Sequence, residues 1–173
     1  MNLEQMLAWD RKLSQNPDSG GVFQSAELAE TKRLGDWEPL FRVFNGIAVT
    51  ILQKHVPLLG NFWYLPKGPG VANVSQLGDL LPELRKGAVL HNVFTIKIEP
   101  ELEKTDETHQ QIIALGFMPS RAVQPNSSTV LVDLHPGEHE LLAGFNQKAR
   151  HAINRALRDG VTAETVMFSP ANA

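Results

Sequence analysis

The sequence contains no cysteine among its 173 residues. Disulfide bonds, thiolate nucleophiles and cysteine-based zinc sites are therefore excluded. The sequence also lacks an apolar run approaching the ~18 residues that span a bilayer. Residues 1–12 lack the basic segment and apolar core of a secretory signal. We therefore expect a soluble cytoplasmic protein that makes no stable insertion into a membrane.

Several catalytic and cofactor-binding motifs are absent as well. Of the six histidines, His135 and His139 have the i, i+4 spacing of a helix face, but Pro136-Gly137 lies between them, and no His-Glu-x-x-His motif occurs. There is no Gly-x-Ser-x-Gly elbow, no Gly-x-Gly-x-x-Gly fingerprint and no Walker A sequence. A zinc hydrolase, an α/β-hydrolase, a Rossmann domain and a P-loop are therefore unsupported, and we expect neither a metal nor a cofactor.

The composition is that of an ordinary globular protein, with 42% hydrophobic and 20% charged residues. This length predicts a single domain over residues 1–173. The net charge of −3 and a pI near 6.1 argue against a general polyanion binder. Any contact with RNA or phosphate must therefore come from a local basic patch.

The apolar periodicity predicts a mixed order of helices and strands. Helices are expected at 3–13, 25–34, 75–84, 105–115 and 137–159, and strands at 37–44, 47–55, 62–65, 92–98, 123–124, 129–134 and 161–167. Asn45-Gly46 is the strongest local signal, because this dipeptide favours a type I′ hairpin turn. Pro82 favours a division of the third helix. The expected fold class is α/β, an α+β mixed sheet with helices on its faces. Because the last expected strand begins only a few residues before the end of the sequence, we also expect a truncated C-terminus.

The stretch from Phe62 to Gly70 is central to these predictions. Phe62–Leu65 has the composition of a short buried strand, Pro66 ends it, and the following Gly-Pro-Gly predicts a tight turn. Lys67 lies where the strand becomes the turn. The cation and the exposed N–H groups are a plausible anion cradle, and the alternative is an ordinary connection with a solvated lysine.

Glu99 is the candidate catalytic carboxylate. It closes the strand at 92–98, and Pro100 fixes the direction in which the chain leaves. If this strand lies beside the strand that ends at Lys67, the two side chains can border a common cleft. The alternative is a glutamate that caps the following turn.

A basic segment lies near the C-terminus. Lys148, His151, Arg155 and Arg158 share one helix face by their spacing, and Arg150 adds a further charge. Such a stripe can contact the phosphates of a nucleotide or of a tRNA end. A solvated helix face is the alternative.

Six short motifs follow one another along nearly the whole chain. The first is Phe23-Gln24-Ser25 followed by Glu27, Ala29, Lys32 and Trp37-Glu38-Pro39. Then come Tyr64-Leu65-Pro66-Lys67-Gly68-Pro69, Lys97-Ile98-Glu99-Pro100 and Leu115-Gly116-Phe117. The last two are Gln124-Pro125 with Thr129–Leu134, and Asn146-Gln147-Lys148-Ala149-Arg150 through Arg158-Asp159-Gly160-Val161. In this order they resemble the FemABX family of nonribosomal aminoacyltransferases, which extend the peptide bridges of bacterial peptidoglycan.

The resemblance implies a GNAT-like acyltransferase fold in a single copy, matching the N-terminal half of a family whose members carry two. It implies an aminoacyl-tRNA donor and, as acceptor, UDP-MurNAc-pentapeptide or lipid II, whose stem-peptide amine attacks the ester. Lys32 matches a lysine that contacts the acceptor's phosphates, and Glu99 matches a residue of acceptor binding or acid–base work. The remaining implied substrate contacts are Trp37, Lys67 and Gly68, with Lys148, Arg150, Arg155 and Arg158 toward tRNA.

Three positions depart from the family pattern: Leu28 replaces a tryptophan, Glu99 replaces an aspartate, and Gly70 precedes Val71. A conventional GNAT acetyltransferase that uses acetyl-CoA is one alternative function, although its pyrophosphate loop is not found. The other is a non-catalytic binding or assembly half that pairs with a second GNAT-like domain or with itself. The sequence leaves open which amino acid is transferred and whether the acceptor is linked to a nucleotide or to a lipid.

Overall fold

A computed structural model describes residues 1–123 and 132–165 of the chain. These residues belong to two compact units, 1–125 and 126–173, which are treated separately below. The strands predicted at 123–124, 129–134 and 161–167 lie partly outside the described residues. Their described parts, namely Val123, 132–134 and 161–165, are not in strands.

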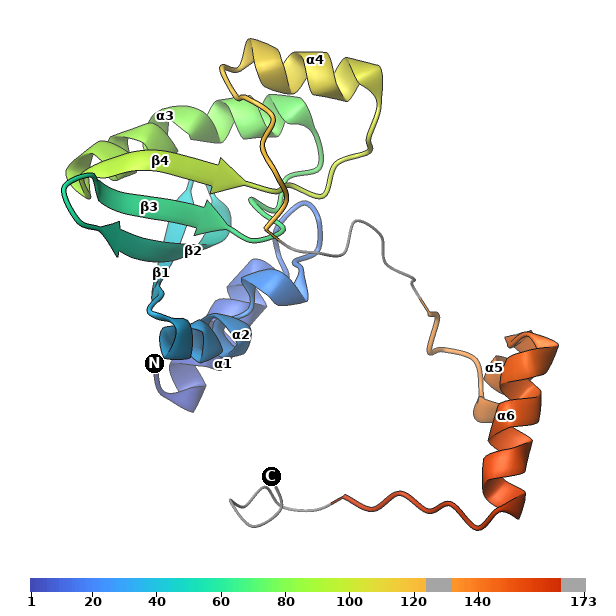
Figure 1. The fold of residues 1–173 in the computed structure, drawn as a ribbon. Coiled ribbons are helices and arrows are strands. Elements are labelled where there is room, and N and C mark those ends of the chain that lie inside the picture. Colours follow the sequence, from blue (N-terminus) through green and yellow to red (C-terminus); the bar gives the residue numbers. More distant parts are fainter. Residues whose placement is uncertain (124–131, 166–173) are drawn as a thin grey trace. The chain divides into compact units, whose positions relative to one another are not determined.

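The first unit contains a four-stranded mixed sheet (Figure 1). Its strands, in the spatial order β1-β2-β3-β4, are β1 (Glu38–Phe44), β2 (Ile47–Val56), β3 (Gly60–Leu65) and β4 (Val93–Ile98). The β1–β2 and β2–β3 pairs are antiparallel, and the β3–β4 pair is parallel. The predicted mixed α/β class is confirmed, and the arrangement is compatible with a GNAT-like fold.

The β1–β2 hairpin forms where Asn45-Gly46 predicts it. Asn45 and Gly46 have φ angles of 46° and 81°, as a type I′ turn requires. The register runs from Phe44 opposite Ile47 to Glu38 opposite Gln53. This tight turn therefore sets which face of β2 each side chain occupies.

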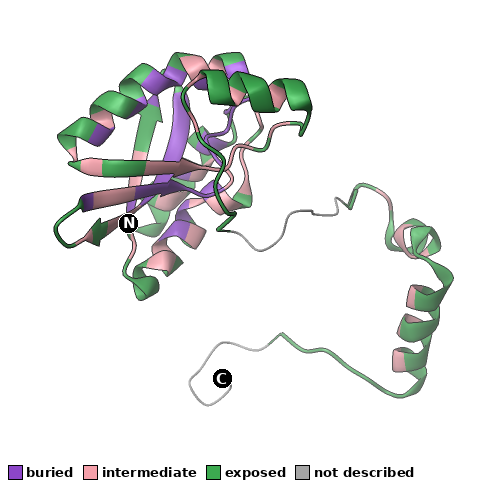
Figure 2. Ribbon diagram, turned by 45° about the horizontal axis from the view of Figure 1, so that its top comes forward, coloured by how far each residue is buried: buried purple, intermediate pink, exposed green. Residues whose placement is uncertain are grey.

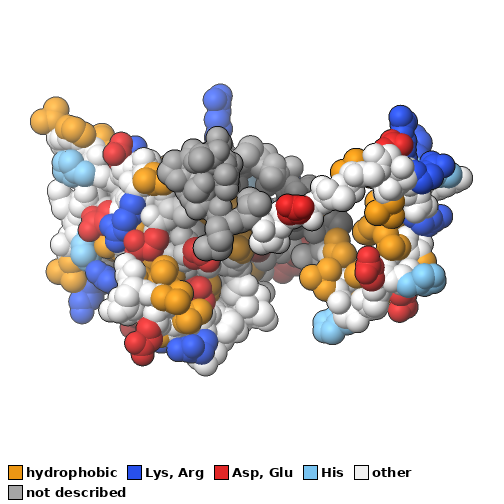
Figure 3. Space-filling model, turned by 90° about the horizontal axis from the view of Figure 1, so that it is seen from below, with side chains coloured by type: hydrophobic (Ala, Val, Ile, Leu, Met, Phe, Trp, Pro, Cys, Tyr) orange, Lys and Arg blue, Asp and Glu red, His pale blue; other side chains and the backbone are white. Residues whose placement is uncertain are grey.

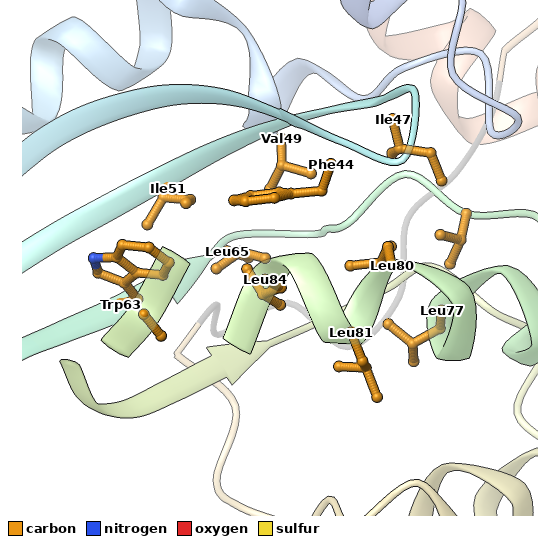
Figure 4. Packing of buried hydrophobic residues seen from close by; sticks show 12 residues of the cluster. Phe44, Ile47, Val49, Ile51, Trp63, Leu65, Leu77, Leu80, Leu81 and Leu84 are labelled. Atoms are coloured by element: carbon orange, nitrogen blue, oxygen red, sulfur yellow. The ribbon is translucent and has the colours of Figure 1, made fainter. Parts of the chain in front are cut away.

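Strand β2 is buried on both faces (Figure 2). Its alternate residues Ile47, Val49 and Ile51 join the main apolar cluster beneath α3, whereas Ala48 and Leu52 pack on the side of α1 and α2. Figure 4 shows Leu84 of α3 against Leu65 of the sheet, with Leu77, Leu80 and Leu81 of the same cluster along the helix. The sheet is therefore the middle layer between two sets of helices.

Helix α3 (Val74–Leu90) connects the two parallel strands and is longer than predicted. Asn73, rather than the predicted Ser75, caps it by accepting a hydrogen bond from the Gln76 N–H. The predicted division at Pro82 is wrong, since the helix is continuous through it. Pro82 lies on the exposed side. Burial of the α3 leucines outweighs its cost of about 3 kcal/mol.

Strand β4 and helix α4 (Asp106–Ala114) complete the α3 side of the unit. The predicted strand β4 is present, but it is less buried than predicted, and Phe94 is 45% exposed. Among the described residues β4 pairs only with β3, so its other edge has no neighbouring strand. Helix α4 begins at Thr105, whose hydroxyl accepts a hydrogen bond from the Thr108 N–H. It is followed by Gly116 with a φ of 90°, as predicted.

The opposite face carries α1 (Leu3–Leu13) and α2 (Ala26–Thr31), with 3-10 turns η1 (Val22–Gln24) and η2 (Lys32–Gly35) beside α2. The α1 bounds match the prediction, but Trp9 and Leu13 are buried while Leu3 and Leu7 are exposed. Ser25 caps α2 as predicted. Helix α2 ends earlier than predicted, and Asp36 rather than Gly35 takes the left-handed conformation.

In the second unit, the helix predicted from 137 to 159 is instead two helices. They are α5 (Glu138–Gly144) and α6 (Gln147–Arg158), separated by extended residues at Phe145 and Asn146. The Asn146 side chain accepts a hydrogen bond from the Ala149 N–H at 2.9 Å and so starts a new helix. Gly160 ends α6 with a φ of 74°, as predicted. In the two described ranges, no helix has both the length and the apolar character that crossing a bilayer demands.

Candidate active site

The candidate site lies where the parallel strands β3 and β4 end. Leu65 pairs with Ile98, so the turn after β3 and the exit from β4 start at the same edge of the sheet. The Glu99 N–H donates a hydrogen bond to the Gly68 carbonyl at 3.0 Å. The strand before Glu99 thus lies beside the strand that ends at Lys67, which is the condition for these residues to share one site.

Two donors hold the half-buried Glu99 carboxylate. The Tyr64 hydroxyl donates to Oε2 at 2.6 Å, and the Val123 N–H donates to Oε1 at 2.8 Å. An ionised carboxylate offers about four lone-pair positions, so positions remain for a substrate. Glu99 is therefore oriented by the protein and still able to accept a further proton or hydrogen bond.

Lys97 fastens a later segment to the end of β4. Its Nζ donates to the Ser120 hydroxyl at 2.7 Å and to the carbonyl oxygen of Arg121. These bonds hold residues 120–121 beside the strand and bring the Val123 N–H to Glu99. The glutamate thus receives one donor from its own sheet and one from a segment 24 residues later.

The turn after β3 rests on the buried side chain of Gln24, which is 1% exposed. Gln24 Nε2 donates to the carbonyl oxygens of Pro66 at 2.7 Å and Thr50 at 3.2 Å. Its Oε1 accepts from the Thr50 N–H at 2.8 Å. The Trp9 indole N–H donates to the Thr50 hydroxyl at 3.0 Å. This network satisfies the buried polar groups and joins η1, β2 and the turn.

The two glycines of the turn allow close packing. A Cβ at Gly68 would lie 2.8 Å from Cδ and Nε2 of Gln24, and one at Gly70 would lie 2.5 Å from Oδ1 of Asp18. Gly68, predicted as a substrate contact, is buried and has a clear packing reason for being glycine. The Asp18 carboxylate lies against Gly70. Its negative charge disfavours the binding of an anion on that side of the turn.

Lys67 has a φ of 48°, a left-handed conformation that non-glycine residues seldom adopt. Its side chain is half-buried, and it makes no hydrogen bond or ion pair with the described residues. Lys67 therefore combines a strained backbone with a charge unpaired among the described residues, and the next residue, Gly68, is hydrogen-bonded to Glu99. Strained residues of this kind are often found at functional sites. The anion cradle itself stays a prediction.

Trp37 packs beside Tyr64 on the α2 side of the sheet, and Lys32 precedes it in η2. The Trp37 ring lies 6.0 Å from the Phe62 ring and 6.1 Å from the Tyr64 ring, and Lys54 Nζ lies 5.6 Å from its centroid. The backbone N–H of Trp37 donates to the backbone carbonyl of Lys32 at 3.3 Å. Contacts therefore link the main chain at Lys32, through the Trp37 and Tyr64 side chains, to Glu99, and the Lys32 ammonium takes no part in them.

The predicted tRNA contacts belong to α6 of the second unit. Figure 3 shows Lys and Arg side chains gathered on one side of this unit and hydrophobic side chains on another. Arg150 differs from the rest, because its guanidinium donates to the carbonyl oxygens of Ala143, at 2.9 Å, and Phe145 at the end of α5. Lys148 makes no side-chain bond to the described residues.

The other two arginines of α6 make contacts within the helix. Arg155 pairs with Asp159 at 3.3 Å, and Arg158 donates to the Asn154 carbonyl at 3.3 Å. Both pairs are at the exposed surface, where they contribute little to stability. Lys148, Arg155 and Arg158 therefore form the basic stripe, and Arg150 lies off it as a cap for α5.

Three residues of the site, Tyr64, Gln24 and Lys97, have no role in the predictions made from the sequence. All three lie inside the quoted motifs, and this position is the signal by which they could have been found. Their roles depend on pairing between distant segments: Tyr64 faces Glu99 across 35 residues, and Gln24 reaches Pro66 across 42. Local patterns do not carry this information.

A search of protein-family models finds no match to this chain. Curated relatives are proteins named lipid II:glycine glycyltransferase. The one from Staphylococcus aureus strain MRSA252 is 28% identical over 90% of this chain and 41% of its own length. Another from Staphylococcus aureus is 27% identical over 84% of this chain and 39% of its own length. The chain thus spans about 40% of the length of these relatives, and they confirm the family resemblance that the motifs indicate.

Proposed function

We propose, from the order of the motifs and from the similarity to proteins named lipid II:glycine glycyltransferase, that this chain is the acceptor-binding part of an aminoacyltransferase of the FemABX family. The donor is an aminoacyl-tRNA, and the acceptor is the stem-peptide amine of a peptidoglycan precursor. The relatives' name specifies glycine and lipid II, which favours glycine as the transferred residue and lipid II as the acceptor. UDP-MurNAc-pentapeptide is the soluble alternative.

For this transfer the protein needs to hold the amine and the ester in position and to supply a group that accepts the amine's proton. The amine nitrogen attacks the ester carbonyl carbon, and the bond from that carbon to the terminal ribose oxygen of the tRNA breaks. The amine gives up a proton and the ribose oxygen gains one. Glu99 is the proposed acceptor of the amine's proton. The supporting observation is that Tyr64 and Val123 orient its carboxylate and leave some of its lone pairs unoccupied.

The contacts of Trp37 with Tyr64, and of Tyr64 with Glu99, support a direction for the acceptor. The Lys32 ammonium, which makes no ion pair with the described residues, is the proposed contact to the acceptor's phosphates. Trp37 and Tyr64 offer an aromatic surface between Lys32 and Glu99. The stem-peptide amine is then at Glu99, beside Lys67.

We assign residues 1–173 to the first of two GNAT-like copies. A second copy, on the same chain or on a partner, would complete the donor site. The basic stripe of Lys148, Arg155 and Arg158 is the proposed contribution of this chain to phosphates near the tRNA end. We therefore expect the 173-residue chain to bind the acceptor and to transfer little by itself.

Titration calorimetry with UDP-MurNAc-pentapeptide tests acceptor binding. Lys32→Met should weaken it about tenfold, as expected for a charge-assisted phosphate contact. Lys12→Met, which removes an exposed lysine from α1, should leave it unchanged. Absence of binding by the unmodified chain would contradict the proposal, and binding of acetyl-CoA instead would favour an acetyltransferase.

A transfer assay with radiolabelled glycyl-tRNA tests the chemical role. In any assembly that transfers glycine, Glu99→Gln should preserve acceptor affinity within about threefold and lower the transfer rate at least about a hundredfold. An unchanged rate would remove Glu99 from the reaction. Robust transfer by the unmodified 173-residue chain alone would contradict the need for a second copy.

A further inference from the structure

An exposed apolar patch lies at the end of the sheet opposite Glu99. Its members are Leu58 and Leu59 in the turn between β2 and β3, and Val89 and Leu90 at the end of α3. Their exposed fractions are 105%, 59%, 79% and 77%. We call these four residues the leucine patch. Single exposed leucines are common, but a group of four is unusual and indicates a contact surface.

The two turns that carry the leucine patch are bonded to each other. The Asn61 N–H donates to the Asn92 carbonyl at 2.9 Å, and Asn61 Nδ2 donates to the His91 carbonyl at 2.7 Å. Figure 1 shows both connections at the same end of the sheet. The patch is therefore supported by the rigid sheet and not by a separate loop.

The conformation of Leu58 adds a second reason to look for a function. Pro57 followed by a left-handed residue is the pattern of a type II turn, whose third position favours glycine or asparagine. Leu58 has a φ of 69° and is fully exposed. A leucine there gains nothing from burial and carries backbone strain, so folding alone does not account for it.

The two segments that carry the leucine patch are basic in sequence. Residues 53–61 and 84–96 contain Lys54, Arg85, Lys86 and two histidines and no aspartate or glutamate. Lys54 lies over the Trp37 ring and Arg85 donates to the Leu115 carbonyl, so Lys86 is the cation of these segments that makes no side-chain bond to the described residues. The chain as a whole has more acidic than basic residues, 19 against 16. The acidic side chains nearest to these segments are Glu38, which accepts a hydrogen bond from Gln53, and Glu83, which accepts one from the Asn45 N–H. Exposed apolar side chains bordered by cations suit the interface of an anionic membrane.

We propose that the leucine patch docks this protein on the surface of an anionic phospholipid membrane. The leucines enter the headgroup region, and Lys86 contacts a lipid phosphate. The choice of a membrane rests on the proposed function, because lipid II is an acceptor held in a membrane, whereas the patch is an observation independent of it.

The geometry places the reacting groups in the order that a lipid-linked acceptor needs. Strand β3 has six residues and spans about 20 Å, so Glu99 lies roughly that far from the docked end. Glu38 pairs with Gln53, which pairs with Trp63 in the middle of β3, so Trp37, just before Glu38, lies at a level between the leucine patch and Glu99. From the membrane outward the order is leucine patch, the Trp37 segment whose backbone is hydrogen-bonded to Lys32, and Glu99. A lipid-linked acceptor presents its lipid, its pyrophosphate and its peptide in the same order.

Sedimentation with vesicles of phosphatidylcholine and phosphatidylglycerol, without acceptor or tRNA, tests the docking. The unmodified chain should bind these vesicles and should bind pure phosphatidylcholine more weakly. The double variant Leu58→Asn, Leu59→Ser should lower the partition coefficient at least about tenfold. Asparagine tolerates the left-handed conformation, so this variant should keep the fold, which its circular dichroism and urea midpoint verify.

Leu3→Ser is the matched control, because it removes a leucine that is 68% exposed on α1. It should leave the partition coefficient unchanged. Since the chain has no cysteine, Leu59→Cys and Leu3→Cys can each carry one environment-sensitive fluorophore, and only the label at 59 should shift to the blue with vesicles.

Failure of the unmodified chain to bind, or equal binding by the double variant, would overturn the docking proposal. Self-association through the patch without vesicle binding, seen by light scattering, would overturn it as well. None of these results affects acceptor binding, which is measured with a soluble nucleotide-linked acceptor.

Discussion

Gly68→Ala is the substitution for which the structure makes the sharpest prediction. Gly68 is buried under Gln24 and its φ lies outside the left-handed region. The effect of an alanine is therefore a packing effect and not backbone strain. The added Cβ would lie 2.8 Å from Cδ and Nε2 and 3.0 Å from Oε1 of Gln24, well inside van der Waals contact.

The Gln24 side chain cannot move aside without loss. Its amide is held by three hydrogen bonds to Thr50 and Pro66 at 2.7–3.2 Å. Overpacking of a tight interior costs about 1–3 kcal/mol, and a lost hydrogen bond at a buried group adds about 1 kcal/mol. Gly68→Ala should therefore lower the free energy of unfolding by about 2–4 kcal/mol.

Urea unfolding followed by tryptophan fluorescence measures this change, because Trp9 and Trp63 are buried. Gly21→Ala is the matched control, since its Cβ would meet nothing closer than 3.7 Å; it should change stability by less than about 0.5 kcal/mol. In a Gln24→Ala background the obstacle is gone, so adding Gly68→Ala should cost less than about 0.5 kcal/mol. A single variant as stable as the unmodified chain, or strictly additive effects, would refute this account.

Three further changes test other parts of the structure. Tyr64→Phe removes the hydroxyl that donates to Glu99, and urea unfolding should show a loss of about 1 kcal/mol. Asn146→Ala removes the cap of α6 and should lower the helical signal in circular dichroism, because such a cap contributes about 1 kcal/mol. The Arg33 guanidinium, hydrogen-bonded to Glu30, holds the pKa of that carboxyl below its ordinary value of 4.5. The stabilisation of the folded state is at most about 0.5 kcal/mol. It is complete at pH values above the ordinary pKa and is lost as the pH falls through the lower pKa of the folded state. The free energy of unfolding of Glu30→Gln, measured as a function of pH, should not show this acid-induced loss.

Many elements of the first unit could be predicted because their signals are local. Asn45-Gly46 makes the hairpin, Ser25 and Thr105 cap helices, and Gly116 ends one. In each case a few adjacent residues favour one backbone conformation over others. Long apolar segments such as β2 add burial to this local preference, which makes their prediction secure.

The wrong predictions have a common cause, which is competition between local signals. Asn73 and Ser75 can both cap a helix, and the earlier residue does so. Pro82 has the local tendency to break a helix, but tertiary burial of the α3 leucines is worth more. In the second unit the opposite holds: Asn146 divides the helix where few residues are buried to oppose it.

The sequence by itself determined the absence of thiol chemistry, the hairpin, the turn at Pro66–Gly70 and the order of motifs that indicates the family. Only the tertiary structure decided that Tyr64 binds Glu99, that Gln24 lies against Gly68, and that Leu58 is exposed at the far end of the sheet. The physical reason is that strand register and packing join segments tens of residues apart. A shift of one residue between β3 and β4 would point Tyr64 to the other face relative to its partner.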